Sequence, residues 1–244
     1  MGHVIGIHAV ESILRNQPAQ IHTLMLLEKN RNGRLEALWR AAQEASLAIR
    51  LLSREALDEL DPSGKHQGVI ASVKQRKPLS EKSLFSLLDT LPHDPLLLLL
   101  DGVQDPHNLG ACMRSAEAAG VDAVIVPKDR AVGLTEVVAK VASGALEMLP
   151  FIQVTNVVRT LTQLKKQGLW VAGAAGESES SIYDVNLKGP LVIAMGGESK
   201  GLRRLTREHC DYLMRIPMRG RSESLNVSVA TGVCLFEACR QREI

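Results

Sequence analysis

The feature that constrains the fold most is an alternation of short apolar runs with helical segments between residues 93 and 244. Strand-like runs occupy residues 96–101, 123–127, 169–174, 191–196 and 213–218. Helical periods lie between them at residues 109–119, 135–142, 157–167 and 202–209, and a last helix is expected at 227–240. Because the runs are apolar throughout, the alternation predicts an α/β domain whose parallel sheet is covered by helices on both faces.

Residues 1–73 predict a second, smaller α/β unit. Strands are expected at residues 21–27, 49–52 and 68–73. Helices are expected at residues 8–15 and 34–46, and a short one follows Ser53 as its N-cap. The stretch Lys74-Gln75-Arg76-Lys77-Pro78 is basic and ends in proline, which is typical of a linker. The sequence therefore predicts domains at 1–73 and 93–244, joined by a linker at 74–92.

Composition excludes several classes of protein. The longest apolar run, at residues 96–100, is too short to cross a membrane, and the N-terminus lacks the pattern of a signal peptide. The four cysteines form no C-x-x-C pair, which favours free thiols in a cytoplasmic protein over a zinc site or a disulfide framework. Aromatic residues make up only 3% of the chain, which disfavours domains that bind RNA by base stacking.

Three polar segments follow strands of the expected parallel sheet, at residues 105–114, 196–201 and 220–226. Parallel sheets bind ligands at the carboxyl ends of their strands, so these segments predict a binding site. Composition alone allows a plainer interpretation of the third segment, because Ser222, Ser224 and Asn226 are all good N-caps for a buried helix. The segments contain no G-x-G-x-x-G fingerprint, P-loop or nucleophile elbow, and we expect no metal site.

The same segments resemble the three motifs of the SpoU (SPOUT, TrmH-like) RNA ribose 2′-O-methyltransferases. The first motif is similar to Asp105-Pro-His-Asn-Leu-Gly-Ala-Cys-Met-Arg114 and the second to Gly196-Gly-Glu-Ser-Lys-Gly201. The third is similar to the stretch from Ile216-Pro-Met to Ser224-Leu-Asn-Val-Ser-Val-Ala230. Gly6-Ile-His-Ala-Val extends the likeness into the first domain. The chain departs from the family only in Arg221 and Glu223, at variable positions of the third motif.

This resemblance implies a fold, a cofactor and a substrate. The first domain would be an L30-like RNA-binding unit, and the second a parallel-sheet SPOUT domain with a deep trefoil knot. S-adenosylmethionine would be bound by Gly196, Ile216 and Leu225. Catalytic roles would fall to five residues: Asn108, Arg114, Glu198, Ser224 and Asn226. The expected reaction is 2′-O-methylation of a guanosine in 23S ribosomal RNA, and DNA, which lacks the hydroxyl, would not be a substrate.

Two alternatives remain open at this stage. The motifs specify the chemistry rather than the target, so transfer RNA is a second possible substrate. A non-catalytic RNA-binding protein on the same fold is another, and it would not need Arg114, Glu198 or Asn226. The last helix is apolar on nearly every side, which favours a homodimer formed through Val229, Val233 and Phe236.

Arg114 and Glu198 are the two candidates to accept the proton of the ribose hydroxyl. Family convention assigns this role to Arg114, but a guanidinium keeps its proton up to a pKa above about 12. We therefore expect Arg114 to remain charged, to clamp the target phosphate and to stabilise the developing alkoxide. Glu198 would accept the proton, directly or through water, while Asn108, Ser224 and Asn226 orient the ribose.

Overall fold

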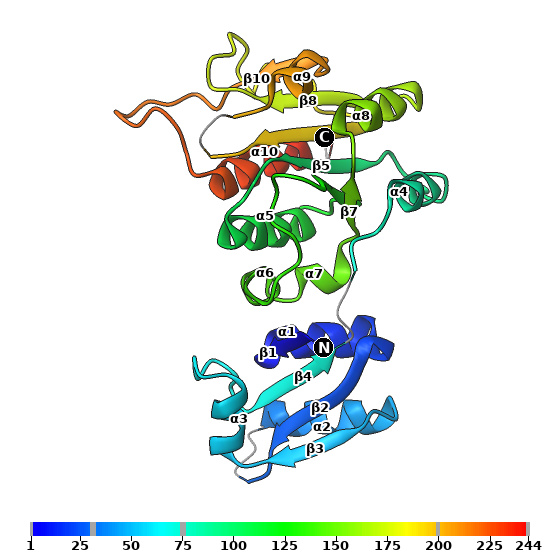
Figure 1. The fold of residues 1–244 in the computed structure, drawn as a ribbon, viewed down its shortest axis with the longest axis vertical. Helices are drawn as coiled ribbons and strands as arrows, with labels where there is room; N and C mark the ends of the chain where they lie inside the picture. Colours follow the sequence, from blue (N-terminus) through cyan, green and yellow to red (C-terminus); the bar gives the residue numbers. More distant parts are fainter. Residues whose placement is uncertain (1, 30–32, 74–76, 199–200, 243–244) are drawn as a thin grey trace. The chain divides into compact units, whose positions relative to one another are not determined.

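The computed structural model describes residues 2–29, 33–73, 77–198 and 201–242, which form two compact units (Figure 1). One unit contains Met1–Lys77 together with Leu134–Met148, and the other contains Pro78–Gly133 together with Leu149–Ile244. These units differ from the expected domains in two places. Residues 134–148 pack with the first unit, and residues 78–92 belong to the second. The basic stretch at 74–76 lies outside the described residues.

The first unit is built on a four-stranded sheet in the order β1-β4-β2-β3. The strands are β1 (Gly2–Ile5), β2 (Ile21–Leu27), β3 (Ile49–Leu52) and β4 (Val69–Val73). β4 is antiparallel to both β1 and β2, whereas β2 and β3 are parallel. Apolar residues of α1 (Ile7–Asn16) and α2 (Gly33–Glu44) cover one face, and Leu57 of α3 (Arg54–Leu60) packs on the other. The sequence-based prediction missed β1.

An ion pair fastens residues 134–148 to the rest of the first unit. This segment forms α6 (Glu136–Ala142) and α7 (Ala145–Met148), which contact β1 and α1. Lys140 Nζ donates to Asp61 Oδ1 at 3.3 Å and to Ser63 Oγ at 2.7 Å. The Asp61 side chain is buried and also accepts the backbone N–H groups of Ser63 and Lys65. The pairing explains why a segment so distant in sequence clusters here.

The second unit contains a parallel sheet of six strands in the order β10-β8-β9-β5-β6-β7. Its strands are β5 (Leu96–Asp101), β6 (Ala123–Pro127), β7 (Phe151–Val154), β8 (Trp170–Ala174), β9 (Leu191–Gly196) and β10 (Tyr212–Met214). The expectation of five strands was wrong, because β7 was missed. The expected end of the last strand at residue 218 was also wrong. Beyond Met214, Arg215 forms only a single bridge with Ser181, since the chain then leaves the sheet.

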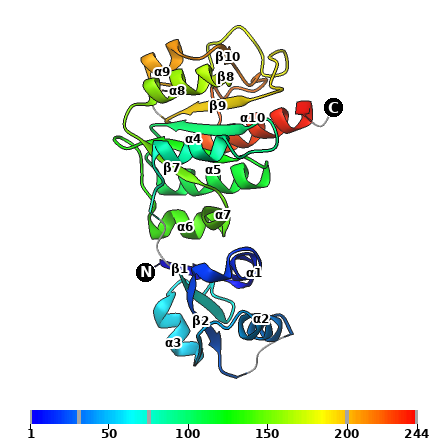
Figure 2. The same cartoon turned by 90° about the vertical axis from the view of Figure 1, so that its right-hand side faces the viewer.

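Helices cover both faces of the six-stranded sheet. Residues of α4 (Glu81–Leu88) and α8 (Val157–Lys166) join the apolar cluster on one face. On the other face, α5 (Pro106–Ala118) and α10 (Val227–Arg242) lie side by side in both views (Figures 1 and 2). The short α9 (Arg204–Glu208) follows β9. Among the described residues, no helix is long and apolar enough to cross a membrane, and no cluster of possible metal ligands occurs.

Candidate active site

A pocket of about 440 Å³ lies at the carboxyl edge of the six-stranded sheet. It is lined by the ends of β8, β9 and β10 and by the first turn of α10. All three residues expected to bind a cofactor, Gly196, Ile216 and Leu225, line this pocket, and so do Glu198 and Ser224. The parallel sheet explains this convergence, because the loops that follow parallel strands meet at one edge.

Two glycines let backbone segments pass very close to one another beside the pocket. A Cβ atom on Gly196 would lie 1.9 Å from the carbonyl carbon of Gly201, and one on Gly197 would lie 2.5 Å from the carbonyl oxygen of Gly102. Gly201 N donates to Gly197 O at 3.0 Å, so these two glycines are also joined through their backbones. Only glycine fits at positions 196 and 197.

A buried carboxylate holds the same loop against the centre of the sheet. Asp101, at the end of β5, is 1% exposed, and its Oδ2 accepts the backbone N–H of Arg203 at 3.1 Å. Arg203 Nε donates to Asp101 Oδ1 at 2.6 Å. The sequence analysis missed this pair. A charged residue at the end of the apolar run 96–101 was the available signal, since a buried charge needs a partner.

Three predicted catalytic residues from distant parts of the chain form one hydrogen-bond chain. Asn226 Nδ2 donates to Asn108 Oδ1 at 3.0 Å, and Asn108 Nδ2 donates to Glu198 Oε1 at 2.7 Å. Asn108 lies in the first turn of α5, Glu198 follows β9, and Asn226 precedes α10. Glu198 and Asn226 are exposed and Asn108 is half-buried between them, so the two ends of the chain lie where a substrate can reach them. It connects the three motifs, at the pocket lined by Glu198 and Asn226.

Asn226 also begins the last helix. Its Oδ1 accepts the backbone N–H of Ser228 at 2.9 Å and the Ser228 hydroxyl at 2.6 Å. Among the three N-cap candidates named from the sequence, Asn226 is therefore the cap, and its amide N–H remains available to Asn108. Ser224 is exposed and lines the pocket, while Ser222 is exposed outside the lining.

The structure does not bring Arg114 to the pocket. Arg114 is exposed on α5, six residues after Asn108, which places it about 9 Å further along the axis and about 240° around it. It forms no hydrogen bond or ion pair with any residue that the structure describes. The helix expected to begin at residue 109 begins earlier, at Pro106, with Asp105 as its N-cap, so the first polar segment is mostly helical.

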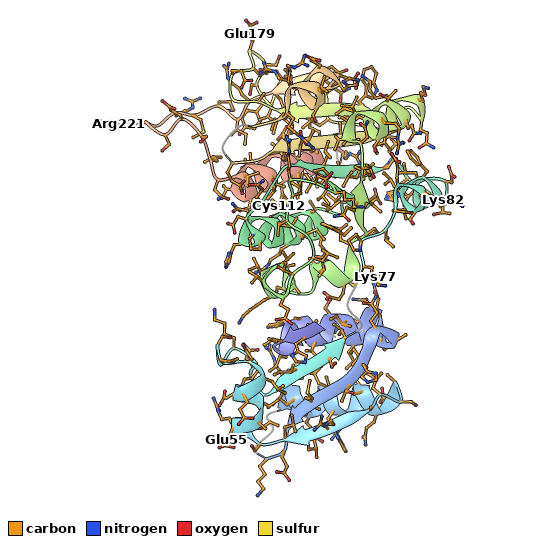
Figure 3. The ribbon with its side chains drawn as sticks, viewed as in Figure 1. Glu55, Lys77, Lys82, Cys112, Glu179 and Arg221 are labelled. Atoms are coloured by element: carbon orange, nitrogen blue, oxygen red, sulfur yellow. The ribbon has the colours of Figure 1, made fainter. Side chains whose placement is uncertain are left out.

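Electrostatics disfavour thiol chemistry at this site. Burial raises the pKa of the Cys112 thiol to about 11; its hydrogen bond to Thr231 opposes the rise and the negative charge of Glu198 adds to it. Burial likewise raises the pKa values of Cys210 and Cys234 to about 12. These thiols stay protonated near neutral pH. Figure 3 shows Cys112 on α5, and Arg221 at the outer end of the loop that projects before α10.

The pocket suits a cationic ligand of the size of S-adenosylmethionine. Its volume falls in the range of roughly 300–1,000 Å³ that is usual for small-molecule sites. Two carboxylates, Glu198 and Glu223, and one cation, Arg215, line it beside apolar residues such as Met195. The close approach of the backbone at Gly196 leaves main-chain groups, rather than long side chains, to form this part of the wall.

Comparisons with known families agree on both parts of the chain. Residues 95–236 match the SpoU rRNA Methylase family. Residues 3–79 match the family described as RNA 2′-O ribose methyltransferase substrate binding.

Similar proteins extend over nearly the whole chain. The 23S rRNA (guanosine-2′-O-)-methyltransferase RlmB of Shewanella oneidensis is 55% identical over 98% of this chain and 97% of its own. The enzyme of the same name from Escherichia coli K12 is 49% identical over 98% of each chain. A crystal structure of an RNA 2′-O ribose methyltransferase has a TM-score of 0.77 at 28% identity, covering 99% of this chain and 89% of its own. The SpoU methyltransferase AviRb from Streptomyces viridochromogenes, in complex with AdoMet, has a TM-score of 0.79 at 23% identity, covering 98% and 89%.

Proposed function

Since the chain belongs to the SpoU rRNA Methylase family, we propose that it methylates the ribose 2′-hydroxyl of a guanosine in 23S ribosomal RNA. The hydrogen-bond chain Asn226–Asn108–Glu198 is the observation that carries this proposal. It connects three loops beside a pocket of cofactor size, which an RNA-binding protein without catalytic function would not require. Relatives that are about half identical over their full length bear the name of this same enzyme.

The methyl donor is S-adenosylmethionine, and we propose that Gly196, Ile216 and Leu225 hold it. When bound, it supplies a methyl group on a positively charged sulfur and leaves as a neutral thioether, so no acid is needed for the leaving group. Among the described residues, Glu198 and Glu223 line the pocket against one cation, Arg215, and this excess of carboxylate favours a cationic ligand over a neutral one.

Glu198 is suited to accept the proton of the ribose hydroxyl. Asn108 holds Oε1 of Glu198, and Oε2 makes no hydrogen bond with the described residues. The free oxygen is exposed and can take the proton directly or through one water. Asn226 fixes Asn108 in turn, so the carboxylate is oriented by the start of α10. Ser224, on the pocket wall, is placed to orient the ribose.

Arg114 is suited to a role in RNA binding rather than in proton transfer. Its guanidinium is exposed, lies outside the pocket and has no partner among the described residues, so its five N–H donors can bind a phosphate. A planar guanidinium binds phosphate in bidentate fashion, which would fix the target nucleotide.

The first domain, residues 1–73, is proposed to bind RNA, in agreement with its match to a substrate-binding family. Arg34 and Lys65 are exposed candidates for phosphate contacts. Deleting the whole domain would also remove the partners of residues 134–148, so neutralising Arg34 and Lys65 is a cleaner test. We expect the double variant to bind RNA more weakly, with a smaller salt dependence and unchanged cofactor affinity.

Further proposals concern fold, assembly and location. We propose that the second domain carries the deep trefoil knot and that the first is L30-like. The tight passage of Gly196 against Gly201 and the Asp101–Arg203 pair support a threaded loop. We also propose a homodimer formed through the catalytic domain and a cytoplasmic location, where ribosomal RNA is modified.

Mass spectrometry of ribosomal RNA tests the proposed function. A strain that lacks the gene should lose one 2′-O-methylguanosine from 23S ribosomal RNA. The wild-type gene should restore it, and the Glu198→Gln gene should not. Unchanged 23S ribosomal RNA together with a lost transfer-RNA methylation would establish the alternative substrate. Full restoration by Glu198→Gln would contradict the catalytic assignment.

A further inference from the structure

A second hollow, of about 520 Å³, opens at the carboxyl edge of the same sheet. It is lined by residues that follow β6 and β7 and by the start of α9. We call it the arginine cleft, because Arg130, Arg203 and Arg204 line it and Asp129 is the one acidic residue in its lining. None of the predicted site residues lines the arginine cleft, so the chemistry proposed above does not explain it.

The arginine cleft lies next to the cofactor pocket. Gly201 lines the pocket, and Arg203, two residues further along the chain, lines the cleft. Successive Cα atoms are about 3.8 Å apart, so these two residues lie within about 7.6 Å of each other. The buried Asp101 fixes this part of the loop through Arg203. A strand of RNA with one nucleotide beside Glu198 would therefore have a neighbouring nucleotide near the cleft.

Two of the three arginines have charges available for a ligand. Arg203 is bound to Asp101, but Arg130 is exposed and makes no hydrogen bond or ion pair in the described part of the chain. Arg204 pairs with Glu208 one helical turn away, and the two side chains are 78% and 50% exposed. Such exposed ion pairs are weak, so Glu208 competes little with a phosphate for Arg204.

The backbone conformation of Arg130 is an independent indication that the cleft binds a ligand. Its φ angle is 61°, in the left-handed region that residues with a side chain rarely adopt. The surrounding loop is held in place by Val132 N, which donates to Val103 O at 3.0 Å. Strained conformations of this kind concentrate at binding sites, where the surrounding structure fixes them. The start of α8 also lines the cleft, and a helix N-terminus favours an anion.

We propose that the arginine cleft binds a phosphodiester of the RNA strand beside the methylated nucleotide, through Arg130 and Arg204. This proposal rests on the proposed function, since it assumes that RNA reaches the pocket. Guanidinium groups bind phosphate oxygens through paired N–H donors, which accounts for arginine at both positions. Phosphate contacts position the RNA without reading its sequence. The cleft therefore sets the affinity for RNA rather than the chemical step.

The test compares matched charge-neutral variants of the full chain. The double variant Arg130→Asn, Arg204→Gln removes both charges, and asparagine tolerates the left-handed backbone at residue 130. Lys82→Gln, Lys166→Gln is the control, because both lysines are exposed and line neither hollow. Affinity for a 23S ribosomal RNA transcript is measured at several salt concentrations, and affinity for S-adenosylmethionine is measured by calorimetry on the same preparations.

The arginine variant should lose RNA affinity on the order of tenfold, and the slope of log affinity against log salt should fall by about 0.7–0.9, the value for one phosphate. The control should stay near wild type, and all proteins should bind S-adenosylmethionine equally. Asp129→Asn should strengthen RNA binding, which damage to the fold would not produce. Equal losses in the arginine variant and the control, or no gain from Asp129→Asn, would overturn the proposal.

The test of the arginine cleft can fail or succeed independently of the proposed function. At saturating RNA the arginine variant should methylate the same nucleotide as the wild type, because the cleft takes no part in the chemical step. If the wild type methylated no guanosine of 23S ribosomal RNA, the proposed function would fail, while the salt slopes would still report on phosphate binding in the cleft.

Discussion

At the scale of single residues, the hydrogen bond between Asn108 and Glu198 separates two candidate bases. The structure places Glu198 at the pocket and Arg114 outside its lining. Proton transfer requires the base to lie within hydrogen-bond reach of the hydroxyl, or one water away. The position of Glu198 at the pocket and the high proton affinity of the Arg114 guanidinium therefore both favour Glu198 as the base.

We expect Glu198→Gln to lower single-turnover methylation by about 10²-fold or more, because the amide cannot accept the proton. The acid limb of the pH–rate profile should disappear with this change. Arg114→Lys should also lower turnover, on the order of 10²-fold, but should keep the acid limb, since it alters phosphate positioning. Both variants should bind S-adenosylmethionine as the wild type does. An acid limb that survives in Glu198→Gln and vanishes in Arg114→Lys would return the base role to the arginine.

The glycine at the end of β9 gives a second prediction at this scale. Gly196→Ala would place a Cβ atom 1.9 Å from backbone of Gly201, and backbone on both sides cannot move away cheaply. We expect this change to cost about 3 kcal/mol or more of unfolding free energy, and to abolish cofactor binding. Gly220→Ala is the matched control, because a Cβ atom there meets nothing within 4 Å. Denaturant unfolding and calorimetry measure both effects. Equal stability of the two variants would show that the loop can open.

At the scale of elements, the sequence located the inner strands of the six-stranded sheet better than its edge strands. Residues 96–101, 123–127 and 191–196 are buried on both faces, and the structure has strands with those same bounds. β7, at one edge, was missed because Phe151–Val154 is only four residues long and follows directly on α7 and Pro150. α4 was missed because its apolar residues lie in a segment that a basic, proline-ended stretch had marked as linker.

At the site, too, the sequence reveals local patterns but not pairs of residues that are distant in the chain. Each motif was readable from its own residues, and the structure brings Asn108, Glu198 and Asn226 together as their placement after parallel strands implies. The Asp101–Arg203 pair joins residues that are 102 positions apart, and no local pattern in the sequence specifies such a partner. The arginine cleft is likewise a product of three loops. Long-range side-chain pairing is the part that sequence periodicity does not encode.

The ion pair between α6 and the end of α3 supports a prediction about pH. Burial acts to raise the pKa of Asp61, but hydrogen bonds from Ser63 and Lys140 outweigh it and hold that pKa below its usual range. A carboxyl group with a lowered folded pKa adds stability above its unfolded value, near 4, and this contribution is lost as pH falls through the folded value. Asp61→Asn should therefore flatten the acid side of the stability profile.

Lys140→Met should cost about 1–2 kcal/mol near neutral pH, because it removes a charged hydrogen bond to a buried carboxylate. Lys166→Met serves as control, since Lys166 is exposed on α8. Denaturant unfolding from about pH 3 to pH 7 measures both the unfolding free energy lost in Lys140→Met and the dependence of stability on pH in Asp61→Asn. If Asp61→Asn kept the wild-type acid slope, another carboxylate would be responsible.

At the scale of the whole molecule, the division into units was less predictable than the elements. Charge and proline content located a linker, but they carry no information on which helices pack where. Residues 134–148 follow β6 in the chain and yet pack with the first unit, through Lys140 and the contacts of α6 with β1 and of α7 with α1. Because this segment depends on the first unit, truncation at the linker would remove more than an RNA-binding surface.

The last prediction concerns assembly. On α10, Val229 and Phe236 are 52% and 53% exposed, and Val233 between them is partly exposed. Positions i, i+4 and i+7 share one side of a helix, so these three residues form an exposed apolar stripe on α10. Burying the stripe in a second copy would remove it from water, and we expect a dimer at micromolar concentration. Val229→Asp, Phe236→Glu should sediment as a monomer, because a dimer would bury two unpaired charges per chain. Tyr183→Ser, which removes another exposed side chain outside α10, should remain dimeric. A wild-type protein that sediments as a monomer would contradict the dimer, and a charged variant that stays dimeric would place the interface elsewhere.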